Sequence, residues 1–210
     1  MPITAQSLLL RASVDLQDSD GTRWPVLELL GHLNEALRTL LTLRPDLNAL
    51  TAPFTPVAGA TQTLPATACT FIDVPRNAAG RKRAITKVDR NLLDRQAPDW
   101  MSAQPSTEAL HFMFDLREPR VFHTYPPLSA TALLELTVSP CPLEITQAST
   151  IDLPAYWDTA LLHYMLHRAY SKDAEFGANT TLSASHLALF SAASGAQLQP
   201  AATVSAGPAP

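Results

Sequence analysis

The sequence predicts an α+β fold in which N- and C-terminal helices form a helical bundle and an antiparallel β module is inserted between them. Two observations predict it. Apolar residues recur at helical spacing near both ends of the chain. Between these ends, prolines and glycines separate short runs rich in Thr, Val, Phe and Tyr. The 210 residues suffice for one compact domain or two small ones. We expect four parts: bundle helices at 1–50, a β-rich module at 51–150, further bundle helices at 151–195 and a flexible tail at 196–210.

The N-terminal part predicts two helices. From Thr4 to Leu16 the apolar residues fall on one helical face, and an Asp-Ser-Asp-Gly stretch at 18–21 then breaks the helix. Pro25 suits the first turn of a second helix, and Pro45 ends that helix because its ring cannot continue it. The second helix carries an apolar stripe at i, i+3, i+4, i+7 spacing: Val26, Leu29, Leu30, Leu33, Leu37, Leu40 and Leu41.

The middle of the chain predicts an antiparallel sheet and one short helix. Asp89 is placed to cap the short helix, which runs to Ala97. Leu134, Leu136 and Val138 alternate with polar residues, as in a half-buried strand. The expected strands are Ala52–Val57, Gln62–Pro65, Cys69–Val74, Arg83–Val88, His111–Asp115, Val121–Tyr125 and Ala132–Ser139.

The C-terminal part predicts two more helices. The first opens at Pro154, runs to Tyr170 and has two apolar faces, which indicates burial on two sides. It lies either at the centre of the bundle or between the bundle and a neighbouring protein. The last helix is expected to stop at Gly195 and to begin at a capping residue, which is one of Asn179, Thr180 and Thr181.

The tail at 196–210 consists of Ala, Pro, Ser, Gly, Gln, Thr, Val and Leu, without a charged residue. Such a segment buries too little apolar surface to fold alone. Two interpretations remain open. The tail docks on a partner or an adjacent subunit, or it is a terminus without a role.

Composition limits the kind of protein. Charged residues make up 16 % of the chain, against about 25 % in an average domain, and the net charge is −4. Little charge leaves uncharged surface of the kind that partners often cover. Cys69 and Cys141 lie far apart in sequence, so we expect two small buried thiols in a reducing compartment. No run approaches the roughly 20 apolar residues of a membrane span, and no signal peptide is visible, so we expect no membrane association.

The motifs of enzymes are missing from the sequence. There is no G-x-S-x-G elbow, no phosphate-binding loop and no dinucleotide-binding glycine pattern. His163 and His167 are four residues apart, as in zinc sites of the H-E-x-x-H kind, but the glutamate after the first histidine is absent. Polar positions on a packed helix explain both residues better than a metal. We therefore expect no catalytic residue, no metal and no cofactor.

The most uneven charge lies at 76–95, which holds seven of the fifteen basic residues against two acidic ones. One interpretation is a basic loop that contacts DNA in a channel or an acidic partner surface. The other is a solvated hairpin tip at 77–80 whose edge charges prevent strand aggregation. Under the first interpretation the contact residues are Arg76, Arg81, Lys82, Arg83, Lys87 and Arg90.

Four stretches, in order over about residues 4 to 195, carry a family resemblance. The first runs from Arg23-Trp24-Pro25 to Arg44-Pro45-Asp46, and the second from Leu64-Pro65 through Val88-Asp89-Arg90 to Pro98-Asp99-Trp100. The third is Phe114-Asp115-Leu116-Arg117-Glu118-Pro119 with Tyr125-Pro126-Pro127, and the fourth runs from Leu153-Pro154 to Arg168-Ala169-Tyr170-Ser171-Lys172-Asp173-Ala174-Glu175. With these stretches the sequence resembles the head-to-tail adaptor proteins of short-tailed bacteriophages.

The resemblance implies a structural, non-catalytic virion protein. Its subunits would form a homo-oligomeric ring, usually a dodecamer, that connects the portal protein to a tail or nozzle protein and lines the passage of the genomic DNA. It would reside in the neck or tail of the virion, and in the host cytoplasm before assembly. The alternatives are a tail-tube, nozzle or neck subunit and, from another class, a small metal-binding enzyme. Ring formation would favour the adaptor, and activity lost with His163 the enzyme.

Overall fold

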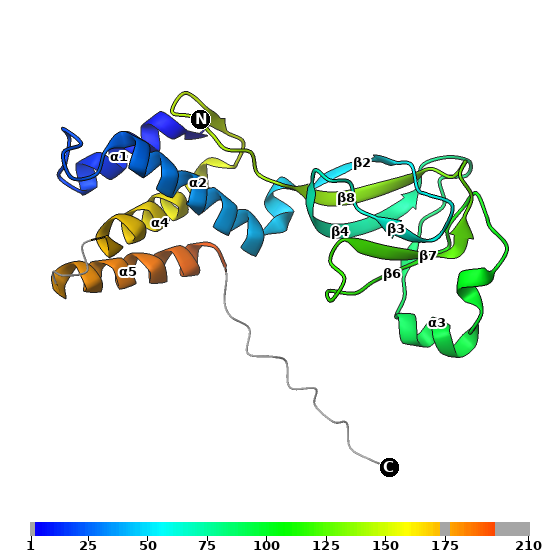
Figure 1. Ribbon diagram of the computed structural model, residues 1–210. Helices are drawn as coiled ribbons and strands as arrows, with labels where there is room; N and C mark the ends of the chain where they lie inside the picture. Colours follow the sequence, from blue (N-terminus) through cyan, green and yellow to red (C-terminus); the bar gives the residue numbers. More distant parts are fainter. Residues whose placement is uncertain (1–2, 173–176, 196–210) are drawn as a thin grey trace, which may run out of the picture. The chain divides into compact units, whose positions relative to one another are not determined.

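The computed structural model describes residues 3–172 and 177–195, and the predicted tail at 196–210 lies outside them (Figure 1). The chain forms two compact units, a helical unit up to Arg44 and from Pro142 onward, and a β unit from Pro45 to Cys141. The N- and C-terminal helices pack together, and the sheets are inserted between them in sequence. This confirms the predicted α+β fold.

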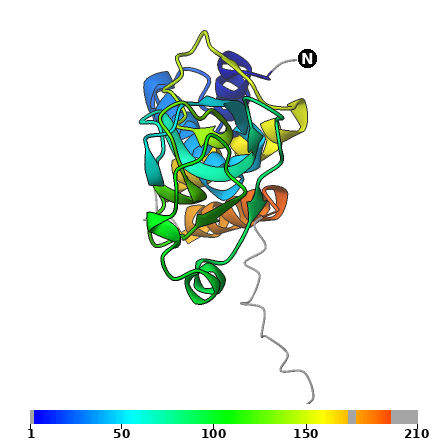
Figure 2. The same cartoon turned by 90° about the vertical axis from the view of Figure 1, so that its right-hand side faces the viewer.

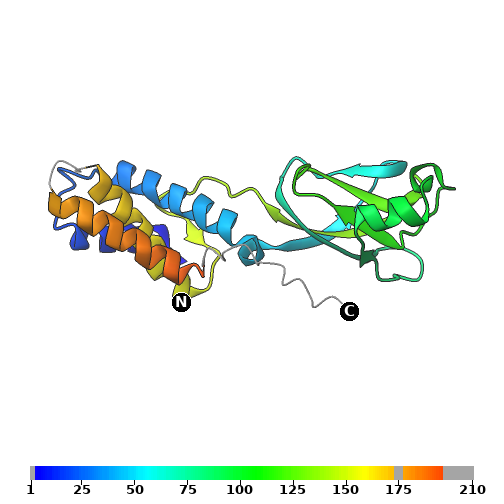
Figure 3. The same cartoon turned by 90° about the horizontal axis from the view of Figure 1, so that it is seen from below.

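The helical unit is organised around one central helix, α4 (Asp158–Ser171). This helix contacts α1, α2 and α5, and Figures 1 and 3 both show it between α2 and α5. The two apolar faces predicted for it are therefore both buried inside the bundle. The other elements of the unit are α1 (Ala5–Asp15), α2 (Val26–Leu43), α5 (Gly177–Ala193), a 3-10 turn (Ala155–Trp157) and the antiparallel pair β1 (Ile3–Thr4) and β9 (Thr150–Ile151).

Helix α2 shows how the apolar pattern determines the packing. Leu29, Leu33 and Leu40 are at most 1 % exposed, and they follow one another at intervals of four and seven residues along one face. Burying each such side chain contributes about 1.5–3 kcal/mol. The helix ends at Leu43, and the Arg44 amide donates a hydrogen bond to the Leu40 carbonyl at 2.8 Å before Pro45 stops it.

The β unit contains two sheets whose facing sides share one apolar core. The strand orders are β2-β8-β4 and β3-β7-β6-β5, antiparallel except for the β5–β6 pair. Phe71 of β4, Phe112 of β6 and Phe122 of β7 meet at the centre of the core. Helix α3 (Arg90–Gln96) is set off from the strands in Figure 2. The strands are β2 (Leu50–Phe54), β3 (Gly59–Thr63), β4 (Ala68–Asn77), β5 (Thr86–Lys87), β6 (His111–Phe114), β7 (Val121–Leu128) and β8 (Leu134–Pro140).

Several local predictions can be judged against these elements. Asp89 caps α3, since its carboxylate accepts a hydrogen bond from the Asn91 amide at 2.7 Å, and Gly195 follows the end of α5 with φ +65°. The strand predicted at Arg83–Val88 is wrong in extent, because only Thr86–Lys87 pairs as a strand. The capping of α5 within 179–181 is also wrong. The helix already begins at Gly177, because no residue that breaks helices separates it from that stretch.

The expectation of two free thiols is wrong, because Cys69 and Cys141 form a disulfide. They lie 72 residues apart in sequence, but β4 and β8 are antiparallel neighbours with Ala68 opposite Pro140. This register places the two Cα atoms 4.8 Å apart, within the range that a disulfide spans. The bond therefore closes a loop around most of the β unit.

In the part of the chain described, none of the helices combines the length and the apolar character needed to cross a bilayer.

Candidate functional site

Three neighbouring cations without an ion-pair partner among the described residues lie on the turn after β4, which is called here the cationic turn: Arg81, Lys82 and Arg83. All three residues are exposed. Lys82 has φ +51° and Gly80 has φ +63°, a backbone conformation that glycine adopts at little cost. A Cβ at Gly80 would also lie 2.8 Å from Oε1 of Glu108. The tight turn thus favours glycine at position 80, and it presents the three cations to solvent.

Asn77 holds the cationic turn in place. Its side chain is buried, and its Nδ2 donates to the carbonyls of Arg83 at 3.0 Å and Ala109 at 2.9 Å. Its Oδ1 accepts a hydrogen bond from the Ala109 amide at 2.8 Å. A buried amide with all these partners fixes the two ends of the turn relative to the loop before β6. One of the two interpretations of the sequence placed 77–80 in a solvated hairpin tip, and neither gave Asn77 this positioning role.

The six residues predicted as contacts differ in how far their charge is already balanced. All six are exposed. Arg76 pairs with Glu135 at 3.4 Å, and Arg90 pairs with Asp94 at 3.7 Å. Within the described ranges, by contrast, the three side chains of the cationic turn have no ion-pair partner. Lys87 likewise has no ion-pair partner among the described residues, but only the cationic turn places three such charges next to one another.

Lys87 and Arg90 line a cleft of about 950 Å³ between the start of α3 and strands β6 and β7. Arg117 also lines it, and its guanidinium forms a bidentate pair with the two carboxylate oxygens of Asp115 at 2.6 and 3.1 Å. The side-chain hydrogen bonds from Arg117 lower the pKa of Asp115 to about 2, so this carboxylate stays ionised. The negative charge of the cleft roughly balances the positive charge of Lys87, Arg90 and Arg117. It comes from four acidic residues in the lining: Asp89, Asp94, Asp115 and Glu118. The structure thus places Lys87 and Arg90 in a mixed-charge cleft, apart from the cationic turn.

Two further polar groups of the cleft, Asp94 and His123, contact neighbouring side chains. The Trp100 indole donates to Asp94 at 2.6 Å, and the ring of Trp100 meets that of His123 edge-on. Burial lowers the pKa of His123, and its Nδ1 lies 3.2 Å from the Thr61 hydroxyl. Across residues 3–172 and 177–195, no group of three His, Cys, Asp or Glu residues could hold a metal ion.

The two histidines of α4 contact α5. Nδ1 of His163 lies 3.1 Å from Nδ1 of His186, and His186 stacks on Tyr170 with an interplanar angle of 5°. Nδ1 of His167 lies 2.9 Å from the hydroxyl of Ser183. These contacts form a polar seam between the two helices.

The His163–His186 pair predicts that the helical unit loses stability in mild acid. Burial lowers the pKa of both rings below the ordinary value of 6.5, and Asp15 opposes the shift. Arg11 adds to the lowering for His163, and His163 followed by His167 adds to it for His186. The unfolded chain therefore takes up protons before the folded chain as the pH falls through 6.5. We expect full stability above that pH and a falling melting temperature below it.

The measurement is a series of thermal melts between about pH 7.5 and about pH 5, followed by helical circular dichroism. The control is the variant His163→Gln/His186→Gln, in which the dependence on pH should become shallower. An identical dependence in both proteins would contradict the role of this pair.

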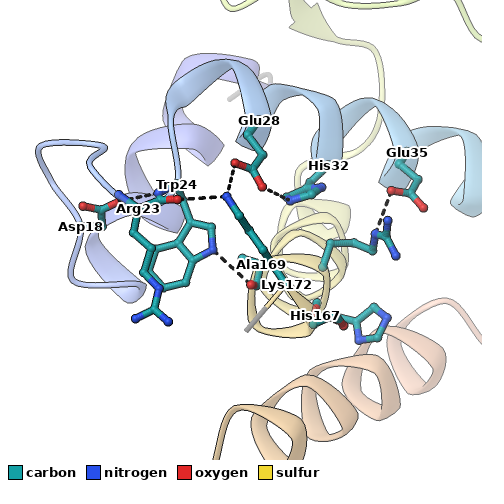
Figure 4. A network of polar contacts seen from close by, with 11 residues as sticks. Asp18, Arg23, Trp24, Glu28, His32, Glu35, His167, Ala169 and Lys172 are labelled. Carbon is teal, nitrogen blue, oxygen red and sulfur yellow. Dashed lines mark hydrogen bonds and ion pairs between the residues drawn. The ribbon is translucent and has the colours of Figure 1, made fainter. Parts of the chain in front are cut away.

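A second polar cluster joins the α1–α2 loop to the C-terminal end of α4 (Figure 4). The carboxylate of Asp18 accepts hydrogen bonds from the amides of Arg23 and Trp24 at 2.9 and 2.7 Å, which lowers its pKa, the Trp24 amide most. The Trp24 indole donates to the carbonyl of Ala169 at 3.1 Å. That carbonyl lies in the last turn of α4, where helices leave carbonyls without an internal partner. Trp24 thus closes the end of α4 from a distant part of the chain.

Two ion pairs continue this cluster along α2. Lys172 contacts Glu28 at 2.7 Å and donates to the Arg23 carbonyl at 3.2 Å. Arg168 pairs with Glu35 at 2.9 Å, and the Tyr164 hydroxyl donates to the same carboxylate at 3.0 Å. These residues belong to the first and fourth stretches of the family resemblance, and the structure assigns them to holding α2 against α4.

A model of the family described as SU10 adaptor protein matches residues 3–209 and so covers both units. No curated protein matches the chain.

Proposed function

The chain belongs to the SU10 adaptor protein family, a family of phage structural adaptors and not of enzymes, and from this premise we propose that its subunits form a ring that connects the portal to the tail. The observation that carries the proposal is the extent of the match, from residue 3 to residue 209. Both units take part in it, so the adaptor role extends to the whole chain and not to a single module.

The proposed ring is a dodecamer, docked under the portal and joined below to a tail or nozzle protein. In a closed ring each subunit contacts its neighbours through two different faces. The chain supports such contacts, because it has few charged residues and exposes several large apolar ones, including Leu116 and Leu143. The genomic DNA would pass through the ring, in the neck of the virion.

Within this assembly the cationic turn is the proposed electrostatic contact. Its three cations are exposed and unpaired among the described residues, and Asn77 fixes the backbone that presents them. The guanidinium groups of Arg81 and Arg83 suit phosphate and carboxylate oxygens, because their planar fork binds two oxygens at once. The partner is therefore polyanionic, either the phosphates of the DNA or an acidic surface of a neighbouring virion protein.

Reversing the turn should impair assembly without unfolding the subunit. We expect Arg81→Glu/Lys82→Glu/Arg83→Glu to melt within a few degrees of the native protein, because these side chains are exposed. Infectious particles or retained DNA should fall at least tenfold, counted by plaque titre and by DNA per particle. If DNA is the partner, the salt dependence of binding should lose a slope of about 0.9 for each phosphate contact removed.

The matched control is Arg38→Glu on α2. Arg38 is half-exposed, and its partner Glu144, at 3.5 Å, is 83 % exposed, so this ion pair contributes little. The control should assemble normally. Normal infectious particles from the triple variant would refute the role of the cationic turn.

Imaging of the virion neck tests the ring itself. We expect averaged images to show a ring of this subunit in contact with the portal above and the tail below. A free subunit that is monomeric in solution is compatible with this, since such a ring can assemble on the portal as a template. Cross-linking and images of intact virions that show no contact with portal or tail would overturn the proposal.

A further inference from the structure

Helix α5 differs from the other helices of the bundle in its surface. It contains no Asp, Glu, Lys or Arg along Gly177–Ala193, whereas α1, α2 and α4 each carry both acidic and basic residues. It packs against α4 through a narrow stripe, in which Ser183 and Phe190 are buried and His186 is half-buried. The rest of the helix surface is uncharged, and most of it is exposed. A solvated helix face normally carries charge, so this surface is suited to a protein partner.

One exposed flank of α5 has the spacing of a coiled-coil seam. Residues 178, 182, 185, 189 and 192 follow one another at intervals of four, three, four and three, and all are exposed. Leu182 is 42 % exposed and Leu189 is 48 % exposed. The three other positions are Ala178, Ser185 and Ala192. Alternating large and small residues at this spacing allow the leucines of one helix to enter the gaps of another.

The opposite flank of α5 repeats the pattern over a shorter distance. Ala184, Leu187 and Ser191 are spaced three and four residues apart, and Leu187 is 40 % exposed. With a rotation of about 100° per residue, the two flanks lie roughly 100° to either side of the stripe buried against α4. Helix α5 therefore presents two different uncharged flanks, one on each side of its attachment to the bundle.

The lack of charged side chains on α5 indicates what kind of partner covers these flanks. A partner helix with charged residues at the contact would lose their hydration without gaining a counter-charge, which is unfavourable. The α5 helix of another copy of the subunit has no charged side chains, so it is a suitable partner. The two flanks are unlike each other, so they favour a head-to-tail contact between copies, which closes into a ring, over a self-matching dimer.

We propose that α5 of each subunit packs between the α5 helices of its two neighbours, with the Leu182–Leu189 flank of one against the Leu187 flank of the next. The inference rests on the proposed ring and names the surface that closes it. A helix of 17 residues is about 25 Å long, so a single contact of this kind is small. The ring is then much more stable than an isolated pair, because every subunit in it has both flanks covered.

Cysteine cross-linking tests the pairing directly. Both native cysteines are held in the Cys69–Cys141 disulfide, so introduced thiols are the free ones. In a ring with its helices along the axis, Leu189 and the neighbour's Leu187 differ in height by about 3 Å. Virions assembled with the variant Leu187→Cys/Leu189→Cys should give, after mild oxidation, a ladder of covalent dimers, trimers and larger species. The single variants Leu187→Cys and Leu189→Cys should give no ladder and no dimer.

Each other outcome is decisive. A dimer from Leu189→Cys alone would show self-matching pairs and overturn the head-to-tail arrangement. Absence of the ladder from the double variant, in virions that contain the subunit, would overturn the inference. If images of those virions still show the ring, the proposed function stands and only the interface is wrong.

Charge substitution gives an independent readout. Leu182→Glu/Leu189→Glu should reduce the incorporation of the subunit into particles at least tenfold, and Leu187→Glu should do the same. The control Leu27→Glu changes a leucine of α2 that is 81 % exposed, and it should be incorporated normally. Equal incorporation of all three variants, with helical circular dichroism unchanged, would also overturn the inference.

Discussion

Loss of the Cys69–Cys141 disulfide should lower the free energy of unfolding of the β unit by about 4 kcal/mol, because the bond closes a long loop and restricts the unfolded chain. The variant Cys69→Ser/Cys141→Ser isolates this effect. Denaturation with guanidinium, followed by the fluorescence of buried Trp100, measures it in the β unit. Unfolding of the helical unit, followed by circular dichroism, should change much less.

Reduction of the native protein provides the matched control. Cys69 is exposed and Cys141 is half-exposed, so a soluble thiol can reach the bond. The reductant should bring the native protein to the stability of the double serine variant and leave that variant unchanged. If the variant is as stable as the oxidised protein, the bond does not contribute to the stability of the β unit.

Replacement of Trp24 by alanine should lower the free energy of unfolding of the helical unit by about 3–5 kcal/mol. The side chain is 6 % exposed and meets the ring of Tyr170 edge-on at 6.5 Å. The substitution also removes the hydrogen bond to the Ala169 carbonyl, which leaves the end of α4 open. Chemical denaturation followed by helical circular dichroism is the measurement.

Two further variants separate packing from hydrogen bonding. Trp24→Phe keeps most of the buried surface and loses the indole donor, so it should cost about 1–3 kcal/mol. Leu27→Ala changes an exposed residue three positions along and should stay within about 0.5 kcal/mol of the native protein. Equal effects of Trp24→Phe and Trp24→Ala would show that the hydrogen bond, and not the packing, holds the end of α4.

The sequence predicts those parts of the fold that depend on local patterns. Helix α2 follows from its apolar stripe and its flanking prolines, and the cap of α3 follows from the acceptor side chain of Asp89. The disulfide could not be predicted, because it depends on the register of β4 against β8, which no local pattern reveals. The start of α5 was missed because Asn and Thr are compatible both with a cap and with the interior of a helix.

The candidate site was predictable in its residues but not in their arrangement. A surplus of basic residues indicates exposure, and all six residues named from the sequence are exposed. Which of them remain uncompensated depends on distant partners, such as Glu135 for Arg76. The anchoring of the cationic turn by Asn77 depends on Ala109, 32 residues away, and is likewise invisible in the sequence. Contacts of this kind, between residues far apart in sequence, depend on the tertiary structure.

The disulfide also determines how the β unit responds to mechanical tension. Two peptide connections, at 44–45 and 141–142, join this unit to the rest of the chain, and Cys141 is the last residue before the second. A pull between the two connections therefore runs from Pro45 to Cys69 and crosses directly to Cys141 through the sulfur atoms. The residues between the two cysteines, which include β6 and β7, carry no load. As long as the bond is intact, stretching can extend only residues 45–69 of the β unit, and the segment between the two cysteines cannot be drawn out by the pull.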